Sequence, residues 1–217
     1  MIDITNAIIG QMEKRYRATL INSLPGFKCL QLIGTSSDNG HSNLGLFNSI
    51  FHLGASPALL GVIFRPQSTD HDTLTNIKRT GIYTLNNVTQ SFVDKAHQTS
   101  ARYESGFSEF VECGLTEYYI PDFEAPFVAE SSVKIGLSVK EIIPIKANDT
   151  TMVIGEIVRI QLNEDLVAAD GFVDHHLAGT ITVAGLDSYY ATTPIARFSY
   201  AKPDRPLTQI SKGKGNI

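Results

Sequence analysis

The sequence lacks the features that most often reveal the class of a protein. It has only two cysteines in 217 residues, Cys29 and Cys113, which lie too far apart for a local metal clip and are too few for a disulfide framework. We expect both to be buried, unreactive thiols. No apolar run approaches the roughly 20 residues needed to cross a bilayer, and no basic segment followed by an apolar one marks the N-terminus. These absences predict a cytoplasmic protein without a membrane partner.

The sequence also lacks a strong excess of charge of either sign. Its 18 basic and 22 acidic residues leave a formal net charge of -4, so no overall field favours nucleic acid. We therefore expect no nucleic-acid partner. The hydrophobic fraction of 42% and charged fraction of 18% are typical of a globular protein. The composition predicts a single folded domain over residues 1–210 and a flexible, polar tail over residues 211–217.

Common catalytic and nucleotide-binding motifs are missing as well. The chain contains no G-x-G-x-x-G, G-x-x-x-x-G-K-[ST], H-E-x-x-H, G-x-S-x-G or C-x-x-C. It has no recognisable set of metal ligands, and no residue is predicted to act as a catalytic acid, base or nucleophile. Any chemistry is therefore expected to depend on a bound cofactor.

What the sequence does have is a series of strand patterns. Apolar and polar residues alternate over 133–139, and the pattern returns over 152–162 after a turn at Asn148-Asp149, which predicts a hairpin. Other strands are expected at 28–34, 44–51, 58–64, 82–88, 180–183 and 195–200. Helices are expected before Arg17, over 73–80 and near 91–99, whereas 100–126 has no clear pattern. Strands outnumber helices without regular alternation, so a mainly β, antiparallel barrel is predicted.

Two regions contain residues suited to binding an anion or a polyol. The segment from Gly34 to Phe51 is rich in hydroxyl and amide groups, although such a segment can also be a purely structural turn. Further on, Arg65 ends an expected strand and Thr73 begins an expected helix, where a guanidinium, a hydroxyl and free N–H groups would suit a phosphate. Alternatively, Arg65 pairs with Asp70 or Asp72, and Thr73 only caps the helix.

Three stretches in these regions follow one another in a specific order. They read G-T-S-S-D-N-G-H-S-N-L-G-L-F-N-S-I-F from Gly34, S-P-A-L-L-G-V-I-F-R-P from Ser56 and H-D-T-L-T-N-I-K-R-T-G-I-Y-T-L-N from His71. In order, spacing and residue type, residues 28–88 resemble the flavin reductase-like domain, a family of FMN-binding split barrels. The resemblance implies an antiparallel split β-barrel of Greek-key type with a few peripheral helices. It also implies a homodimer with FMN near the subunit interface.

The resemblance carries specific site residues with it. Those expected near the isoalloxazine or ribityl group, partly through their backbone, are Thr35, Ser36, Asn43, Leu44 and Phe47. Those expected near the phosphate are Asn48, Ser49, Arg65 and Thr73. The later stretch A-G-L-D-S-Y-Y places Tyr189 or Tyr190 near the flavin or the dimer partner. The sequence departs from the family pattern at Ala184-Gly185, which lack the frequent arginine, at Leu46 and Asn48, which replace proline and serine, and at His71, which replaces lysine.

The function implied by the resemblance is that of an NAD(P)H-dependent flavin reductase. Hydride would pass from the nicotinamide to N5 of FMN and then to a second acceptor, so FMN and NAD(P)H are the expected cofactor and reductant. An alternative is a flavoredoxin-like carrier that receives electrons from a redox partner protein. A third is a binding module in which the barrel persists without flavin.

Overall fold

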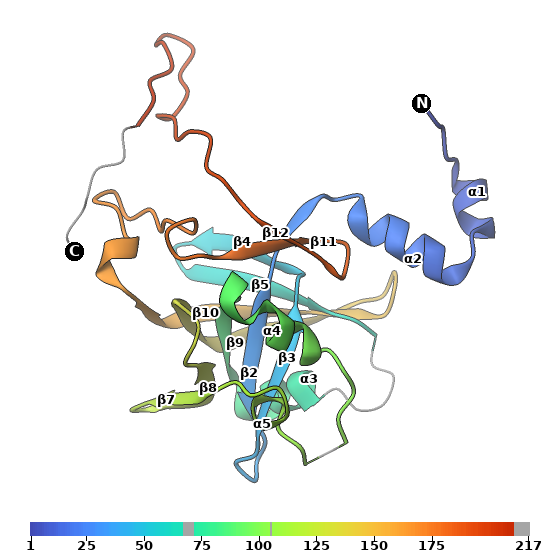
Figure 1. Cartoon of the computed structure of the whole chain (residues 1–217), viewed down its shortest axis with the longest axis vertical. Coiled ribbons are helices and arrows are strands. Elements are labelled where there is room, and N and C mark those ends of the chain that lie inside the picture. The colour runs from blue at the N-terminus through green and yellow to red at the C-terminus, as the bar shows by residue number, and fades with distance from the viewer. Residues whose placement is uncertain (67–71, 105, 211–217) are drawn as a thin grey trace.

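The computed structural model describes residues 1–66, 72–104 and 106–210, with the element order shown in Figure 1. The strands are β1 (Phe27–Cys29), β2 (Gln31–Ser36), β3 (Ser42–Phe47), β4 (Ile50–Ala55), β5 (Ala58–Phe64), β6 (Ile82–Asn87), β7 (Glu117–Ile120), β8 (Phe123–Val128), β9 (Val133–Ile145), β10 (Thr150–Leu162), β11 (Ile181–Ala184) and β12 (Ser188–Ala191). The helices are α1 (Asn6–Gln11), α2 (Lys14–Ser23), α3 (Asp72–Thr80), α4 (Val93–Gln98) and α5 (Glu109–Glu112), with 3₁₀ turns at Gln90–Phe92 and Glu164–Leu166.

The largest sheet in the described part of the chain is antiparallel and strongly curved. Its seven strands lie in the order β3-β2-β6-β9-β10-β5-β4. Strands β3 and β4 occupy opposite edges of this sheet, yet only Asn48 and Ser49 separate them in the chain. The sheet must therefore curl until its two edges meet, and the Ile63 N–H donates to the Ser49 carbonyl at 2.9 Å near this junction. The expected antiparallel split barrel is confirmed.

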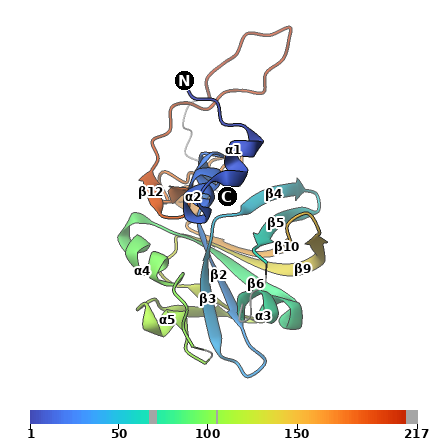
Figure 2. The ribbon, with the colours of Figure 1, turned by 90° about the vertical axis from the view of Figure 1, so that its right-hand side faces the viewer.

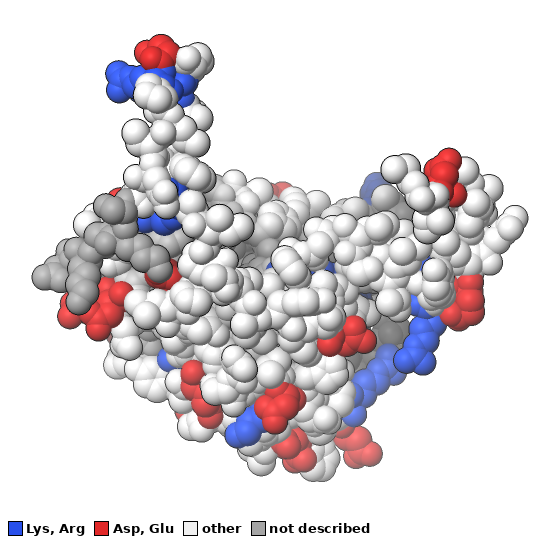
Figure 3. Space-filling model, turned by 45° about the horizontal axis from the view of Figure 1, so that its top comes forward, with Lys and Arg blue, Asp and Glu red and all other residues white. Residues whose placement is uncertain are grey.

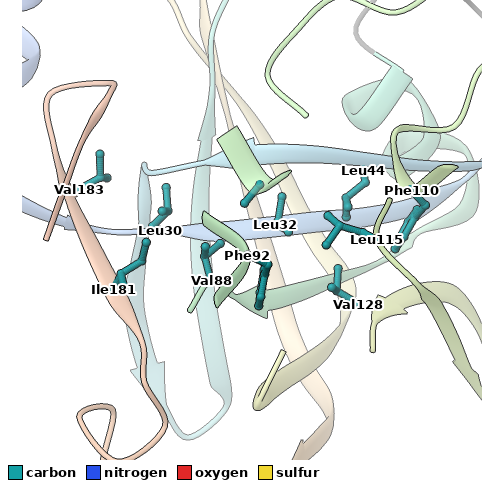
Figure 4. Close-up of a cluster of buried hydrophobic side chains, with 11 residues drawn as sticks. Leu30, Leu32, Leu44, Val88, Phe92, Phe110, Leu115, Val128, Ile181 and Val183 are labelled. Carbon is teal, nitrogen blue, oxygen red and sulfur yellow. The ribbon is translucent and has the colours of Figure 1, made fainter. Parts of the chain in front are cut away.

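Strand β2 runs through the middle of the molecule and is covered on both faces. Residues 31–35 are all buried. Because both faces of the strand are covered, its sequence is a short apolar run and does not alternate between apolar and polar residues. Leu32 belongs to a cluster shared with β3, α4 and β11 (Figure 4). Its neighbour Ile33 belongs to a second cluster inside the barrel, which also contains Tyr83 and Leu137. Both clusters hold β2 and β3 in place, and β3 forms part of the site described below.

Several of the expected elements match the structure closely. Strand β5 covers residues 58–64 as expected, and helix α3 begins one residue before the expected 73–80. Gly81, at φ +72°, donates its N–H to the Ile77 carbonyl and ends α3 in the left-handed conformation that glycine tolerates best. The hairpin of β9 and β10 is confirmed by register, with Val133 opposite Leu162.

Other expectations were wrong. The single strand expected over 44–51 is two strands, because the chain leaves one sheet edge at Asn48 and joins the other at Ile50. Residues 195–200 form no strand, since the extended segment 192–210 has only isolated bridges, such as Phe198 with Gln209. The N-terminal region is two helices and continues to Ser23. The tail expected over 211–217 lies outside the described residues.

The two ends of the described chain project from the same side of the barrel. Figure 2 shows α1, α2 and the segment 192–210 together at one end of the molecule, with α3 and α5 towards the other. Neither α1 nor α2 contains a buried residue. These segments therefore gain little stability from packing against their own barrel.

Candidate functional site

A cavity of about 670 Å³ opens beside the junction where the two edges of the sheet meet. Its first wall comes from β3, the β3–β4 connection, the end of β5 and the start of α3. Its second wall comes from residues 97–103, Glu109 and the turn at Leu186-Asp187. The volume lies within the range of cavities that bind cofactors and drug-sized molecules.

Six of the ten expected site residues line this cavity: Asn43, Phe47, Asn48, Ser49, Arg65 and Thr73. They come from three separate elements and meet because the sheet curls. Their place at a common cavity is what the expected flavin site requires, although contact with a flavin itself stays a prediction.

Buried amide and hydroxyl groups form a connected polar floor. The Asn43 Nδ2 donates to Thr35 Oγ1 at 3.1 Å and to Thr73 Oγ1 at 2.9 Å, and Asn76 Nδ2 donates to Thr35 Oγ1 at 3.2 Å. Both donor hydrogens of Asn43 are therefore used, which fixes its side-chain orientation. The Thr73 oxygen accepts this hydrogen bond, and among the described residues no acceptor for its hydroxyl hydrogen is found. Thr35 lies behind this floor and acts on it through Asn43.

Arg65 stands at the other end of the same wall, on the residue that follows β5. No ion pair within the described residues involves Arg65, so the alternative pairing with Asp72 does not occur. Asp70, the other alternative partner, lies outside the described residues. Next to Arg65 in the cavity wall, Asn48 Nδ2 donates to the Gly185 carbonyl at 3.0 Å, which ties the β11–β12 turn to the barrel. Arg65 and Ser49 thus both line the cavity, and the Ser49 hydroxyl donates to Asn48 Oδ1 at 3.4 Å.

Phe47 supplies an apolar surface between these polar groups. Its ring packs edge-on against Phe64, with the ring centroids 5.0 Å apart. An aromatic ring held by a second ring offers a rigid contact for a flat heterocycle at a small cost in side-chain entropy. The first wall therefore combines a polar floor, an apolar face and a cation.

Most of the second wall was not found from the sequence. His97 lies on α4, and its Nδ1 is 2.5 Å from the hydroxyl oxygen of Tyr189, so Tyr189 reaches the cavity only through His97. Burial raises the pKa of Tyr189, and the charge of Asp187 acts in the same direction. Tyr189 therefore stays a neutral phenol. Leu186 and Asp187 lie within the A-G-L-D-S-Y-Y stretch, whereas His97, residues 99–103 and Glu109 belong to no local motif that marks them in the sequence.

Glu109 places a carboxyl group in the second wall. Its Oε2 accepts a hydrogen bond from the Leu44 N–H at 2.9 Å. Burial raises the pKa of Glu109, and the charge of Asp72 adds to that effect. The Leu44 N–H is thus already occupied, and the Leu44 side chain lies in the hydrophobic core.

This environment leads to a prediction about pH. The folded protein holds the Glu109 proton more tightly than the unfolded chain does. The protonated carboxyl group therefore contributes its full stabilisation of the fold below about pH 4.5, the ordinary carboxyl pKa. This stabilisation is lost as the pH rises through the raised pKa that Glu109 has in the folded state. Glu109→Gln keeps an acceptor for Leu44 and cannot ionise. The difference in free energy of unfolding, variant minus original protein, is therefore expected to increase from about pH 4 to about pH 7. Urea unfolding of both proteins across this range measures the trend, and a difference that stays constant would contradict it.

Ser36 does not line the cavity. Its Oγ donates to the Glu124 carbonyl at 3.1 Å, at the end of β2. Thus Ser36, together with Thr35, Leu44 and Tyr189, is expected to influence a ligand only indirectly in a single chain.

The sequence agrees with a family model over most of its length. Residues 30–178 match the flavin reductase like domain. The chain belongs to this family. A crystal structure from Shewanella frigidimarina, described as a candidate flavin reductase with a split barrel domain, is 44% identical. The match covers 93% of this chain and 100% of that one, with a TM-score of 0.89.

More distant relatives are similar over much of the chain. An uncharacterized protein of Halalkalibacterium halodurans is 27% identical over 168 residues, which is 75% of this chain and 79% of the relative. The flavoredoxin of Desulfovibrio vulgaris is 22% identical and has a TM-score of 0.68, with 82% of this chain and 92% of the flavoredoxin covered. At this identity the likeness shows the shared fold.

The described residues lack two further features. No helix among them is long and apolar enough to span a bilayer. No group of three or more histidine, cysteine, aspartate or glutamate side chains in the same residues is arranged to hold a metal ion.

Proposed function

We propose that this flavin reductase-like protein binds FMN in the cavity and acts as an NAD(P)H-dependent flavin oxidoreductase. The observation that carries the proposal is the arrangement of the first wall. Arg65 and Ser49 suit the phosphate, the hydroxyl of Thr73 suits the ribityl chain or phosphate, and Phe47 suits the ring system. When bound, FMN supplies hydride acceptance at N5 and onward electron transfer.

The residues of the chain position the reactants rather than exchange protons with them. Asn43 holds the Thr73 hydroxyl in place, and Phe47 limits access of water to one side of the cavity. The second wall, which includes His97 and residues 99–103, faces the same space and is proposed to receive the nicotinamide. Burial raises the pKa of Glu109, which disfavours a negative charge on this side of the cavity.

A second candidate function is an FMN electron carrier that is reduced by a partner protein. The observation that favours it is the β11–β12 turn, which lacks the frequent arginine at Ala184-Gly185 and places the carboxyl group of Asp187 at the cavity. A carboxylate there disfavours a phosphate-bearing nicotinamide.

Anaerobic mixing with each reduced nicotinamide separates the two functions. The proposed reductase is expected to lose its flavin absorbance near 450 nm (roughly the usual flavin band) within seconds of adding NADH or NADPH. Flavin that binds but is not bleached by either nicotinamide would contradict the reductase and favour the carrier.

We also propose that the protein is a homodimer. Ile195 is 99% exposed and Tyr200 is 89% exposed on the segment 192–210, and α1 and α2 leave further apolar side chains uncovered. Figure 3 shows that the surface between this segment and the N-terminal helices carries few charged residues. Uncharged surfaces of this extent are typical of protein interfaces.

Sedimentation measures the oligomeric state directly. The protein is expected to have twice the mass of one chain, and Tyr200→Asp is expected to shift the population towards monomer, because the interface would bury a charge. Val111→Asp, at a 73% exposed position on α5, is the matched control and is expected to leave the dimer intact. A monomeric original protein would contradict the proposal.

A further inference from the structure

A second cavity, of about 350 Å³, lies where the β7–β8 hairpin meets the β9–β10 hairpin. It is lined by residues of β7, of the connection between β8 and β9, and of the paired strands β9 and β10 with the residue that follows β10. None of its lining residues lines the larger cavity described above. The volume is near the lower end of the range for cavities that bind small molecules. A ligand here would be small and would leave the larger cavity free.

Lys134 is the charged residue in the lining of this second cavity. It stands opposite Gln161 in the register of β9 and β10, so the two side chains project from the same face of the sheet. Its Nζ donates to the Ser131 carbonyl and lies 5.8 Å from the centroid of the Tyr118 ring. An ammonium has three N–H groups, so two of them remain for a ligand.

The positive charge of Lys134 has no ion-pair partner among the described residues. Partial burial lowers the pKa of Lys134, whereas the negative charge of Glu130 acts in the opposite direction. Both carboxylate oxygens of Glu130 accept hydrogen bonds from the Thr116 N–H, at 3.1 and 3.2 Å, so Glu130 is held by another part of the chain. An anion beside the ammonium would offset the cost of its partial burial.

A buried asparagine fixes the floor of this cavity. The Asn87 carbonyl accepts a hydrogen bond from Ser131 Oγ at 2.7 Å, and Asn87 Nδ2 donates to Ser132 Oγ at 3.1 Å. Asn87 Oδ1 accepts from the Val133 N–H at 2.9 Å, and Ser132 Oγ donates to the Ala178 carbonyl at 2.8 Å. The two serine hydroxyls are thus used within the protein. They hold the cavity in shape and leave ligand binding to other groups.

Amide groups and an aromatic ring complete the lining. Gln161 and Asn163 lie two residues apart, and neither side chain has a hydrogen-bond partner among the described residues. The ring of Tyr118 packs against Phe127, with the ring centroids 6.4 Å apart, and presents a flat apolar face. The cavity therefore combines a cation and two unpartnered amides with an apolar surface.

We propose that this second cavity binds a small organic carboxylate with a flat apolar part. The carboxylate accepts hydrogen bonds from Lys134 and from the amide of Gln161 or Asn163. The apolar part lies against the ring of Tyr118 and the side chain of Leu162. An inorganic anion would leave these apolar surfaces uncovered, and a neutral ligand would leave the ammonium without a counter-charge.

Benzoate, benzamide and acetate test the two parts of the ligand separately, because benzamide lacks the charge and acetate lacks the ring. In NMR titrations, benzoate is expected to shift the backbone amide signals of residues 129–134 and 161–163, with a dissociation constant of about 1 mM. Benzamide and acetate are each expected to bind at least about 5-fold more weakly. The same result is expected with and without FMN, since the two cavities share no lining residue.

Variants of Lys134 test the source of the charge. Lys134→Gln is expected to weaken benzoate binding about 5- to 10-fold and to change benzamide binding by less than about 2-fold. Lys134→Arg keeps the charge and is expected to retain most of the benzoate affinity. Lys146→Gln removes the same charge from an exposed position in the connection between β9 and β10, and it is the matched control. Far-UV circular dichroism establishes that each variant is folded.

A loss of benzoate affinity in Lys134→Gln that Lys134→Arg restores, with shifts limited to the two segments, supports the proposal. Equal affinities for benzoate and benzamide, or no shift at any benzoate concentration, would overturn it. Shifts at residues of the larger cavity instead, such as Asn43 and Ser49, would assign benzoate to that cavity and overturn it as well. If Lys134→Gln does not fold, the ratio of benzoate to benzamide affinity in the original protein decides. A protein that binds no flavin would overturn the proposed function alone.

Discussion

Replacing Gly34 by alanine is expected to lower the free energy of unfolding by about 3 kcal/mol, because β8 crosses β2 at this position without room for a side chain. A Cβ on Gly34 would lie 2.1 Å from the Pro126 carbonyl oxygen and 2.6 Å from the Thr84 hydroxyl oxygen. The Thr84 hydroxyl also donates to that carbonyl at 2.6 Å in a fully buried position. Either β8 must move away or this hydrogen bond must break.

Thermal unfolding measures the effect. A loss of about 3 kcal/mol corresponds to a fall in Tm of about 6 to 12 °C for a chain of this length. Gly10→Ala is the matched control, since a Cβ at Gly10 on α1 meets no atom within 4 Å and the residue has no left-handed backbone. It is expected to leave the Tm unchanged or slightly higher. A Gly34→Ala variant that unfolds at the original temperature would show that β8 does not approach β2 this closely.

Arg65→Ala is expected to weaken FMN binding by about 2 kcal/mol, or roughly 30-fold, and to change riboflavin binding by less than about 3-fold. The reason is that Arg65 has no ion pair among the described residues, so its guanidinium is free to bind the phosphate in two places at once. The size of the effect follows from this planar geometry and from the place of Arg65 in the cavity wall.

Parallel titrations of the two flavins measure this difference. Arg79→Ala removes an arginine that pairs with Asp38 at 3.2 Å, where both side chains are more than half exposed. That exposed pair contributes little to stability, so the variant is a suitable control and is expected to bind FMN normally. If Arg65→Ala weakened FMN and riboflavin equally, Arg65 would act on the shape of the cavity rather than on the phosphate.

The parts of the fold that were predicted from sequence are those with strong local signals. Strand β5 lies between Pro57 and Pro66, and these prolines mark both of its ends. The β9–β10 hairpin has a long alternating pattern on both sides of a turn in which Asp149 adopts φ +57°. Such signals depend on neighbouring residues alone, so they are visible in the sequence.

The elements that were missed depend on distant partners. Strand β8 was expected to be irregular, yet it is held by buried contacts such as that of the Val128 N–H with Asn86 Oδ1, at 2.9 Å. The division between β3 and β4 follows from the curling of the whole sheet, which the run from Leu44 to Phe51 does not reveal. In both cases tertiary contacts, not local pattern, decide the structure.

The candidate site was predicted in part for the same reason. Residues on its first wall, such as Asn43 and Thr73, lie within the stretches that resemble the family. On the second wall, His97 lies in the helix expected near 91–99 and Glu109 lies in the region without clear pattern, and both reach the cavity only through the packing of α4 and α5.

The most direct test of the proposed function is a titration of the flavin-free protein with FMN, in which flavin fluorescence and absorbance are measured at each concentration. The proposed site predicts saturable binding of about one FMN per chain, tighter than that of riboflavin because Arg65, in the cavity wall, is proposed to bind the phosphate. A protein that stays colourless and leaves the FMN signals unchanged at every concentration would contradict the proposal, and would favour a barrel that has kept its fold without the cofactor.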